Sequence, residues 1–367
     1  MSKEFTDLML LVGTNPLPNY VVAKHFIQKN EDLNCIWLLC SEEQESIGQN
    51  STQEIGERIK DVLRHEFCNR DLEFQFISIG DIGSARHIYY TIRNNIKDLT
   101  VGDRTFHLNY TGGTKTMAVH TYRTLEKLFK SNCTFSYLDG REHKIKFDDG
   151  SPKSNDLRLE ISISLENLLD LHGHKEDPSK GKKDFSHAVT KFREIAKEKR
   201  ELDHCDIKKI NSEVDGSGDW LEQYVYEEIM CIIENDRELA ERYDGGKISA
   251  RRNFYSGRKQ KFPGRKNFEL DILVLNGYQV CSISCTVTKD ENERKNKGFE
   301  VIHRSSQIGG DEAKSILVTC MAKDKIKRFS EDLKDISGTS QGNLLVLGLS
   351  DLMPDRLQNK IKKYIWG

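Results

Sequence analysis

Short apolar segments alternate with helical patterns throughout the first 150 residues of this chain. This alternation favours a mostly parallel sheet with helices on both faces, because parallel strands need a crossover connection between them. Ligands of such sheets bind beyond the carboxyl ends of the strands, so the loops at that edge are candidate binding loops. The predicted strands are Leu8–Val12, Cys35–Cys40, Phe74–Ile79, Thr105–Tyr110 and Thr134–Leu138.

One of these loops has an unusual composition. The predicted strand Thr105–Tyr110 runs into Thr111-Gly112-Gly113-Thr114-Lys115-Thr116-Met117, and a helical pattern follows directly. Backbone N–H groups at a helix start attract anions, glycine permits close approach, and hydroxyl and lysine side chains add donors. A Walker A loop is excluded, because it requires glycine immediately before the lysine. A simple strand-to-helix turn is the alternative for the glycines alone, but the whole segment favours a site for a phosphate-bearing ligand.

The composition bounds the function classes. A chain of 367 residues suggests two domains, and its 37% hydrophobic and 31% charged residues are typical of a soluble protein. We expect no membrane partner, since no apolar run is long enough to span a bilayer. The formal net charge of −2 means that contact with nucleic acid must use a local basic patch. The nine cysteines show no metal-binding spacing, which favours reduced cysteines and a cytoplasmic location.

The remainder of the chain predicts a second α/β region. A hairpin extension (Lys144–Phe147 and Leu157–Ile163) and a polar linker (172–183) precede a charged helical segment and a helix from about Asp219. The expected domains are 1–165 and 216–367, joined by a linker and helical connector at 166–215. Further strands are predicted at Ile248–Asn253, Glu269–Leu275, Gln279–Thr286, Ser315–Cys320 and Leu344–Leu347.

Carboxylates in this second region suggest metal chemistry. Glu222 lies beside the apolar stripe of the helix that begins at Asp219, and Glu269 and Asp271 share one face of a predicted strand. Clustered carboxylates bind Mg²⁺ or Mn²⁺, which can activate water for phosphodiester hydrolysis. Taken singly, each of these acids is better explained as a solvated surface charge.

A basic segment lies between these acids. Lys247–Lys266 contains eight basic residues in twenty, no acid, and the aromatic residues Phe254, Tyr255 and Phe262. Phosphate pairing combined with base stacking is what single-stranded nucleic acid requires, although a solvated basic hairpin is the alternative. The candidate nucleic-acid contacts are Arg251, Arg252, Arg258, Lys259, Lys261, Arg265 and Lys266.

Two loops of the first region resemble those of the CARF family, the Rossmann-like sensor domains of type III CRISPR defence. Gly13–Asn19 and Asn109–Met117 are similar to the family's two ligand loops. The resemblance implies a homodimer whose paired loops bind cyclic oligoadenylate. We expect Ser41, Asp81 and Ser84, which follow neighbouring strands, on the same edge. The ligand-binding candidates are Gly13, Thr14, Asn15, Pro16, Leu17, Pro18, Asn19, Ser41, Asp81, Ser84, Asn109, Thr111, Gly112, Gly113, Thr114, Lys115 and Thr116.

The second region resembles a PD-(D/E)XK nuclease domain, and the whole chain is similar to CARF-fused nucleases. This resemblance implies a restriction-endonuclease-like α/β domain with a mixed sheet, Mg²⁺ or Mn²⁺, activation by cyclic tetra-adenylate, and a DNA and/or RNA substrate in antiviral defence. Glu222, Asp271 and Glu269 are the expected metal ligands. The family's Glu-x-Lys is replaced by Ser284-Cys285-Thr286. The catalytic candidates are Glu222, Asp271, Ser284, Thr286, Lys289 as a substitute amine, and Glu269, with Glu300 as a further carboxylate.

Two other functions stay open on the sequence. The chain is alternatively a non-catalytic CARF regulator, whose degenerate second domain only binds nucleic acid or a partner. A third alternative is a sensor domain that cleaves its own cyclic ligand. Metal dependence separates the nuclease from the regulator, since electrostatic binding persists in EDTA and hydrolysis does not.

Overall fold

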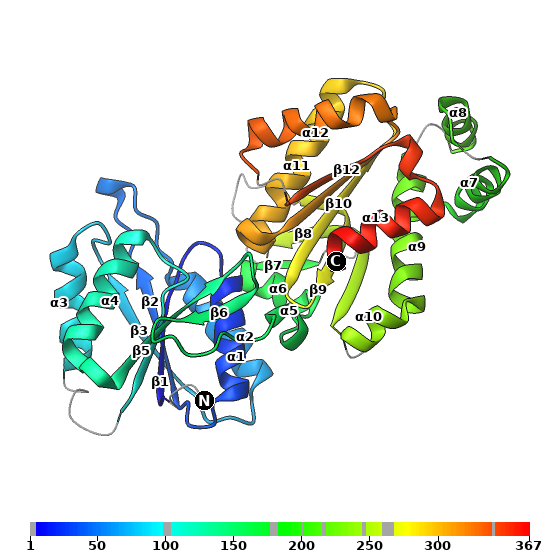
Figure 1. Cartoon of the computed structure of the whole chain (residues 1–367). Helices are drawn as coiled ribbons and strands as arrows, with labels where there is room; N and C mark the ends of the chain where they lie inside the picture. Colours follow the sequence, from blue (N-terminus) through cyan, green and yellow to red (C-terminus); the bar gives the residue numbers. More distant parts are fainter. Residues whose placement is uncertain are drawn as a thin grey trace. The chain divides into compact units, whose positions relative to one another are not determined.

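A computed structural model describes residues 5–97, 104–176, 183–199, 201–214, 218–243, 247–258, 268–339 and 342–367, with the backbone alone at 47, 176, 254–258 and 268. The chain forms two compact units, Met1–His174 and Lys175–Gly367 (Figure 1). The connector predicted at 166–215 is therefore divided between the two units. Among the described helices, none is long and apolar enough to cross a membrane.

The first unit has a six-stranded sheet in the order β3-β2-β1-β4-β5-β6, parallel except for β6. Figure 1 shows α3 and α4 on one side of this sheet and α1 and α2 on the other. Its elements are β1 (Asp7–Leu11), α1 (Leu17–Lys29), β2 (Cys35–Ser41), α2 (Gln53–Glu66), β3 (Glu73–Ile79), α3 (Ala85–Ile96), β4 (Phe106–Asn109), α4 (Lys115–Phe129), β5 (Cys133–Asp139), β6 (Lys144–Phe147), α5 (Leu157–Glu160) and α6 (Leu165–His172).

The sheet forms because its central strands are apolar on both faces. All five residues of β1 and all seven of β2 are buried, as expected for strands covered by helices on each side. Buried residues of α3 and α4, among them Ile88, Ile92 and Leu125, pack with Met9 and Leu11 in one core. The predicted Rossmann-like class of this unit is confirmed.

One predicted element of the first unit is wrong. Residues 157–163 were expected as a strand, but Leu157–Glu160 is the short helix α5, and the hairpin consists of β5 and β6. The Asp156 side chain accepts a hydrogen bond from Arg158 N at 3.0 Å and so starts a helical turn. Ile161 N donates to the carbonyl oxygen of Leu157 at 2.7 Å, which closes one helical turn between these two buried residues.

The second unit has a mixed six-stranded sheet in the order β12-β11-β10-β9-β8-β7. β10, β11 and β12 are parallel, whereas β9 runs antiparallel to β10 and to β8. Its elements are β7 (His174–Glu176, which begins at the last residue of the first unit), α7 (Ser186–Glu198), α8 (His204–Glu213), α9 (Asp219–Asn235), α10 (Arg237–Arg242), β8 (Ile248–Arg258), β9 (Phe268–Asn276), β10 (Gln279–Thr286), α11 (Glu291–Gly309), β11 (Lys314–Thr319), α12 (Lys323–Ser337), β12 (Leu344–Leu347) and α13 (Pro354–Trp366).

Three elements, β9, α9 and α11, pack against β10. α11 contacts β10 and β11, while α9 contacts β8, β9 and β10. All eight residues of β10 are buried, including the hydroxyl-bearing Ser282, Ser284 and Thr286. The predicted mixed α/β sheet is confirmed, and it brings β9, β10, α9 and α11 together around the predicted acids.

Candidate functional site

The two predicted ligand loops of the first unit lie side by side at the centre of its sheet. β1 and β4 are neighbours, but the strands that follow them lie toward opposite edges. This reversal creates the crevice in which open α/β sheets bind ligands. The loops are close enough that a Cβ atom added to Gly13 would lie 3.1 Å from Gly113 N. The first candidate site is therefore at the topological switch point of the sheet.

Glycine is required in the loop after β4. A Cβ atom on Gly112 would lie 2.0 Å from the carbonyl oxygen of Leu11, so no residue with a side chain could be accommodated there. Gly113 has φ of +72°, a left-handed conformation that residues with a Cβ rarely adopt. The glycine pair thus lets this loop pack directly against the end of β1.

The same loop presents a row of backbone amides. Thr114 caps α4, and its hydroxyl oxygen accepts a hydrogen bond from Met117 N at 3.2 Å. No acceptor among the described residues bonds the N–H groups of residues 112–116. Lys115, the first residue of α4, is exposed beside them. Successive amides, a helix N-terminus and an ammonium group together suit a phosphate.

Some predicted ligand groups of this loop instead hold its shape. The Thr111 hydroxyl donates to Asn109 Oδ1 at 2.6 Å and accepts from Leu138 N at 2.7 Å. Asn109 Nδ2 in turn donates to Ser136 Oγ, which also lies 2.7 Å from His107 Nε2. Burial lowers the pKa of His107 to about 3, so this ring is neutral at pH 7. Thr111 and Asn109 therefore position the loop from inside the fold.

The loop after β1 is fixed in a similar way. Asn19 Nδ2 donates to the carbonyl oxygen of Leu11 at 2.8 Å, and Asn15 Oδ1 accepts from Leu17 N at 3.0 Å. Asn19 is buried, whereas Thr14 is exposed at the edge of the crevice. Pro16, Leu17 and Pro18 lie at the start of α1. Among these side chains, Thr14 is the one most open to a ligand.

The three candidates on the neighbouring strands differ in accessibility. Ser41 is buried, and its hydroxyl donates to the carbonyl oxygen of Asn50 at 2.8 Å. Asp81 stabilises its own turn by accepting a hydrogen bond from Gly83 N, and Ser84 caps the start of α3. The Ser41 hydroxyl is thus committed to the fold, while Asp81 and Ser84 lie half-buried at the edge.

The second candidate site surrounds Asp271 on β9. Its Oδ2 atom accepts hydrogen bonds from Ser284 Oγ at 2.9 Å and from Cys285 N at 2.7 Å. Asp271 is only 6% exposed, and burial raises the pKa of its carboxyl group despite these two donors and the nearby Lys297 ammonium. Ser284 therefore orients Asp271. Thr286 is buried, and its hydroxyl oxygen accepts from Thr288 N at 3.3 Å.

Glu222 on α9 shares the electrostatic environment of Asp271. Its pKa is raised to about 9 by burial and then by the negative charges of Asp271, Asp219 and Glu269. The Lys297 ammonium acts in the opposite direction. The carboxyl group of Glu222 is therefore protonated at pH 7. A cation bound at this site would relieve the repulsion between the carboxyl groups.

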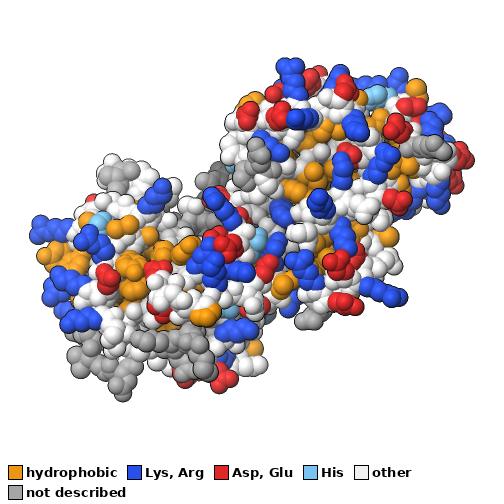
Figure 2. Space-filling model, in the orientation of Figure 1, with side chains coloured by type: hydrophobic (Ala, Val, Ile, Leu, Met, Phe, Trp, Pro, Cys, Tyr) orange, Lys and Arg blue, Asp and Glu red, His pale blue; other side chains and the backbone are white. Residues whose placement is uncertain are grey.

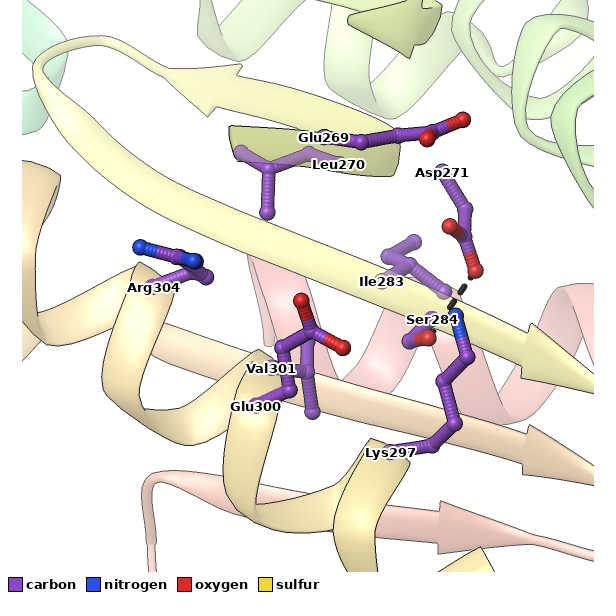
Figure 3. A pocket seen from close by; sticks show the side chains of 9 residues that line it. All are labelled: Glu269, Leu270, Asp271, Ile283, Ser284, Lys297, Glu300, Val301 and Arg304. Atoms are coloured by element: carbon purple, nitrogen blue, oxygen red, sulfur yellow. Dashed lines mark hydrogen bonds between the residues drawn. The ribbon is translucent and has the colours of Figure 1, made fainter. Parts of the chain in front are cut away.

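Lys297 on α11 is the basic group of this site. Burial works against its charge, but Asp271, Glu300 and Glu222 raise the pKa of its ammonium group. Figure 3 shows its amine pointing toward Asp271 and Ser284 across a small cavity of about 70 Å³. The cavity is lined by Glu269, Leu270, Asp271, Ile283, Ser284, Lys297, Glu300, Val301 and Arg304.

Our sequence analysis did not identify Lys297 as a candidate. It proposed Lys289 as the substitute amine, but Lys289 is exposed and does not line this cavity. The sequence does show that Lys297, Val301 and Arg304 are spaced to lie on one face of a helix. This spacing becomes informative only once α11 is known to cover β10. The predicted Glu269 and Glu300 both line the cavity.

The negative charge of these residues suits a divalent cation, but they do not form a complete set of metal ligands. Among the described residues, no group of three His, Cys, Asp or Glu side chains is close enough to hold a metal ion. The negative charge of Asp271 nevertheless raises the pKa of Glu222, and a cation bound between these groups would oppose that effect. Asp271 and Glu222 are the groups that would hold such an ion, with Glu269 beside them.

The predicted nucleic-acid residues are partly within the described structure. The described residues do not include Lys259, Lys261, Phe262, Arg265 and Lys266, nor the side chains of Phe254, Tyr255 and Arg258. Arg251 is exposed on β8. Arg252 is instead used within the fold, because its guanidinium donates to Gln223 Oε1 at 2.8 Å. Figure 2 shows basic and acidic side chains interspersed on the visible face.

The fold and the two sites define a Rossmann-type domain with a phosphate-suited loop and a mixed α/β domain that carries a buried carboxylate site. The model of the Card1 CARF domain matches residues 8–167. The first unit is therefore similar to a CARF domain. No curated protein matches the sequence of this chain.

Solved structures show the same overall fold. Protein VC1899 from Vibrio cholerae has a TM-score of 0.65 at 13% identity, covering 98% of this chain and 97% of that one. Can2 from Sulfobacillus thermosulfidooxidans, solved in complex with cyclic tetra-adenylate, has a TM-score of 0.63 at 15% identity, covering 98% and 99%. A type III CRISPR defence DNA nuclease activated by cyclic oligoadenylate has a TM-score of 0.53 at 15% identity; it covers 87% of this chain, which spans 46% of that one.

The pKa of Glu222 gives a prediction for metal binding. Mn²⁺ binding should release about one proton at pH 7 to 8, because a ligating carboxylate must lose the proton that Glu222 holds below about pH 9. The release should disappear above that pH. Isothermal titration calorimetry in buffers of different ionisation enthalpy measures it, and Glu222→Gln is the control. An Mn²⁺ enthalpy that is independent of buffer would exclude Glu222 as a ligand.

Proposed function

We propose that this protein is a metal-dependent nuclease of type III CRISPR antiviral defence, switched by cyclic oligoadenylate bound to its CARF domain. The observation that carries the proposal is the pairing of a phosphate-suited amide loop in one unit with a buried carboxylate site in the other. The family match supports the sensor, and the complex of Can2 with cyclic tetra-adenylate supports that ligand.

The amide loop accounts for ligand binding. The N–H groups of residues 112–116, together with Lys115, supply donors and positive charge for a phosphate. A cyclic ligand with repeated phosphates matches two copies of the same loop across a two-fold axis. Val119, one turn after Lys115 on α4, is 52% exposed, and an apolar side chain there fits coverage by a second copy of the chain. We therefore propose a homodimer.

The carboxylate site accounts for hydrolysis. Asp271 and Glu222 would hold Mg²⁺ or Mn²⁺, which activates water and stabilises negative charge on the phosphate. Ser284 holds Asp271 in place through its hydrogen bond. Lys297 lines the same cavity, and its ammonium group would stabilise charge that develops on the phosphate, in the role of the missing strand lysine. The basic segment 247–266 would guide a DNA or RNA strand toward this cavity.

One observation favours the regulator instead. Ser284 and Thr286 carry no charge where the related nucleases have a carboxylate and a lysine. A CARF protein whose second unit only binds nucleic acid or a partner would retain such a strand. The two functions differ in whether any hydrolysis is metal-dependent.

Replacement of Lys115 tests the ligand site. Lys115→Ala should weaken cyclic tetra-adenylate binding by about tenfold or more, since a charge-assisted phosphate contact is lost. Calorimetric titration of the ligand measures this. Lys127→Ala, in the last turn of the same helix, should bind like the wild type. Equal weakening in both variants would argue against a specific phosphate contact.

Replacement of Val119 tests the dimer. Val119→Lys should shift the protein from dimer toward monomer, because it buries an ammonium group in the proposed apolar contact. Light scattering coupled to size-exclusion chromatography gives the molar mass. Ile336→Lys is the matched control, since Ile336 is 68% exposed on α12 of the other unit. A Val119→Lys protein with the wild-type mass would exclude this face.

Replacement of Lys297 tests the catalytic site. With labelled single-stranded DNA and RNA, Mn²⁺ and cyclic tetra-adenylate, Asp271→Ala should abolish cleavage. Lys297→Met should slow it about a hundredfold or more, the scale of one lost transition-state donor. Lys289→Met should cleave at the wild-type rate. Full activity of Lys297→Met would show that its charge plays no part, and wild-type cleavage that persists in EDTA would overturn the metal-dependent mechanism.

A further inference from the structure

Asn253 interrupts the regular pairing of β8 across from the buried carboxylate of the second unit. β8 and β9 pair residue by residue over 248–256, except that Asn253 and the residue opposite it, Asp271, form no pair. The pairs on either side keep the same register, so no residue is inserted at this point. The irregularity is therefore confined to the one residue of β8 that lies across from Asp271.

The backbone of Asn253 adopts an uncommon conformation. Its φ is +52°, in the left-handed region, although it lies in the middle of a strand. Among the described residues other than glycine, Lys130 and His143 also have positive φ, but neither lies within a strand. Asparagine tolerates this conformation better than most residues do. Strained residues of this kind cluster at active sites and ligand sites, where the strain is retained for a function.

The side chain of Asn253 has a second unusual property. Its Oδ1 atom is buried, and no described residue donates a hydrogen bond to it. A buried carbonyl oxygen without a partner is costly, and few such atoms occur in native proteins. A divalent cation would satisfy this atom, since amide oxygens are ordinary ligands of hard cations such as Mg²⁺ and Mn²⁺.

Asn253 belongs to a row of polar residues that crosses three strands. By register, Asp271 on β9 lies between Asn253 on β8 and Ser284 on β10, whose hydroxyl donates to Asp271 at 2.9 Å. Opposite residues of antiparallel strands share one face of the sheet. Arg252, the preceding residue, uses the other face, because its guanidinium donates to Gln223 on α9. The row therefore flanks the carboxylate with an amide on one side and a hydroxyl on the other.

We propose that the amide oxygen of Asn253 is a further ligand of the divalent cation, beside Asp271 and Glu222. This inference rests on the proposed function. It explains how a site with the uncharged Ser284 on β10 would still bind metal, because the strand on the other side of Asp271 supplies the missing oxygen. A neutral oxygen also adds no negative charge to a site that already holds two carboxyl groups.

The test is Mn²⁺ binding to the full-length protein, measured by calorimetry. Asn253→Gly removes the amide and suits the backbone, since glycine adopts positive φ without steric cost. We expect its Mn²⁺ dissociation constant to rise about tenfold or more, the scale found even for residues that only support a metal ligand. Its melting temperature without metal should be no lower than that of the wild type, because the strained backbone and the unpartnered oxygen are both removed.

Two further variants complete the design. Asn253→Asp keeps an oxygen at the same position and tolerates the same φ, so it should bind Mn²⁺ at least as tightly as the wild type. Ser249→Gly is the matched control, because Ser249 is exposed four residues earlier on β8. It should keep the wild-type dissociation constant and lower the melting temperature, since glycine weakens an ordinary strand.

The outcomes separate this inference from the function on which it rests. If the wild type binds Mn²⁺ through Asp271 and Asn253→Gly binds it equally well, ligation by Asn253 is overturned and the proposed nuclease stands. An Asn253→Asp protein that binds no more tightly than Asn253→Gly would also overturn the ligation alone. A wild type without Mn²⁺ binding, or with binding that is unchanged in Asp271→Ala, would contradict the proposed function and this inference together.

Discussion

One arrangement in the second unit is costly, because the Asp271 and Glu222 carboxyl groups share one partly buried site. Each charge disfavours the other, and burial disfavours both, so the pKa of Glu222 reaches about 9. A fold gains little from such a pair, because apolar residues of similar size are usually at least as stabilising. The site therefore makes sense as a receptor for positive charge. Lys297 supplies part of that charge from α11, and a divalent cation would supply the rest.

The first unit follows a different principle. Its crevice depends on a close approach, in which Gly112 lies against the carbonyl oxygen of Leu11 with no space for a side chain. The polar side chains around the crevice mostly hold this shape, as the Thr111 and Asn109 hydrogen bonds show. The groups left to face a ligand are mainly backbone amides, Lys115 and Thr14. A rigid set of amides binds phosphate with little loss of conformational freedom, which suits a sensor.

Much of the fold was predictable because its strands are short apolar runs with clear ends. Gln279–Thr286 and Leu344–Leu347 were predicted with their observed bounds. Residues 157–163 were misassigned because a single aspartate cap decides between turn and strand there. β7 lies within the predicted linker, since a three-residue strand has almost no pattern of its own.

The sites were predictable to the extent that they follow strand ends. The switch-point loops could be placed in this way, whereas Asp271, inside β9, was placed by the alternation of its strand and by the family resemblance. The roles of Lys297 and Arg252 could not, because both depend on contacts between elements far apart in the sequence. Lys297 faces Asp271 only because α11 packs on β10, and Arg252 meets Gln223 only because α9 packs on β8. In the sequence both residues look like ordinary surface lysines and arginines, which gives no indication of these partners.

The measurement that tests this account most directly is the initial rate of cleavage of labelled single-stranded DNA and RNA by the wild-type protein in Mn²⁺, with and without cyclic tetra-adenylate. The account predicts cleavage of at least one substrate that depends on the ligand and stops when EDTA is added. Binding of the ligand and of nucleic acid without any cleavage would contradict it and would identify the protein as a regulator.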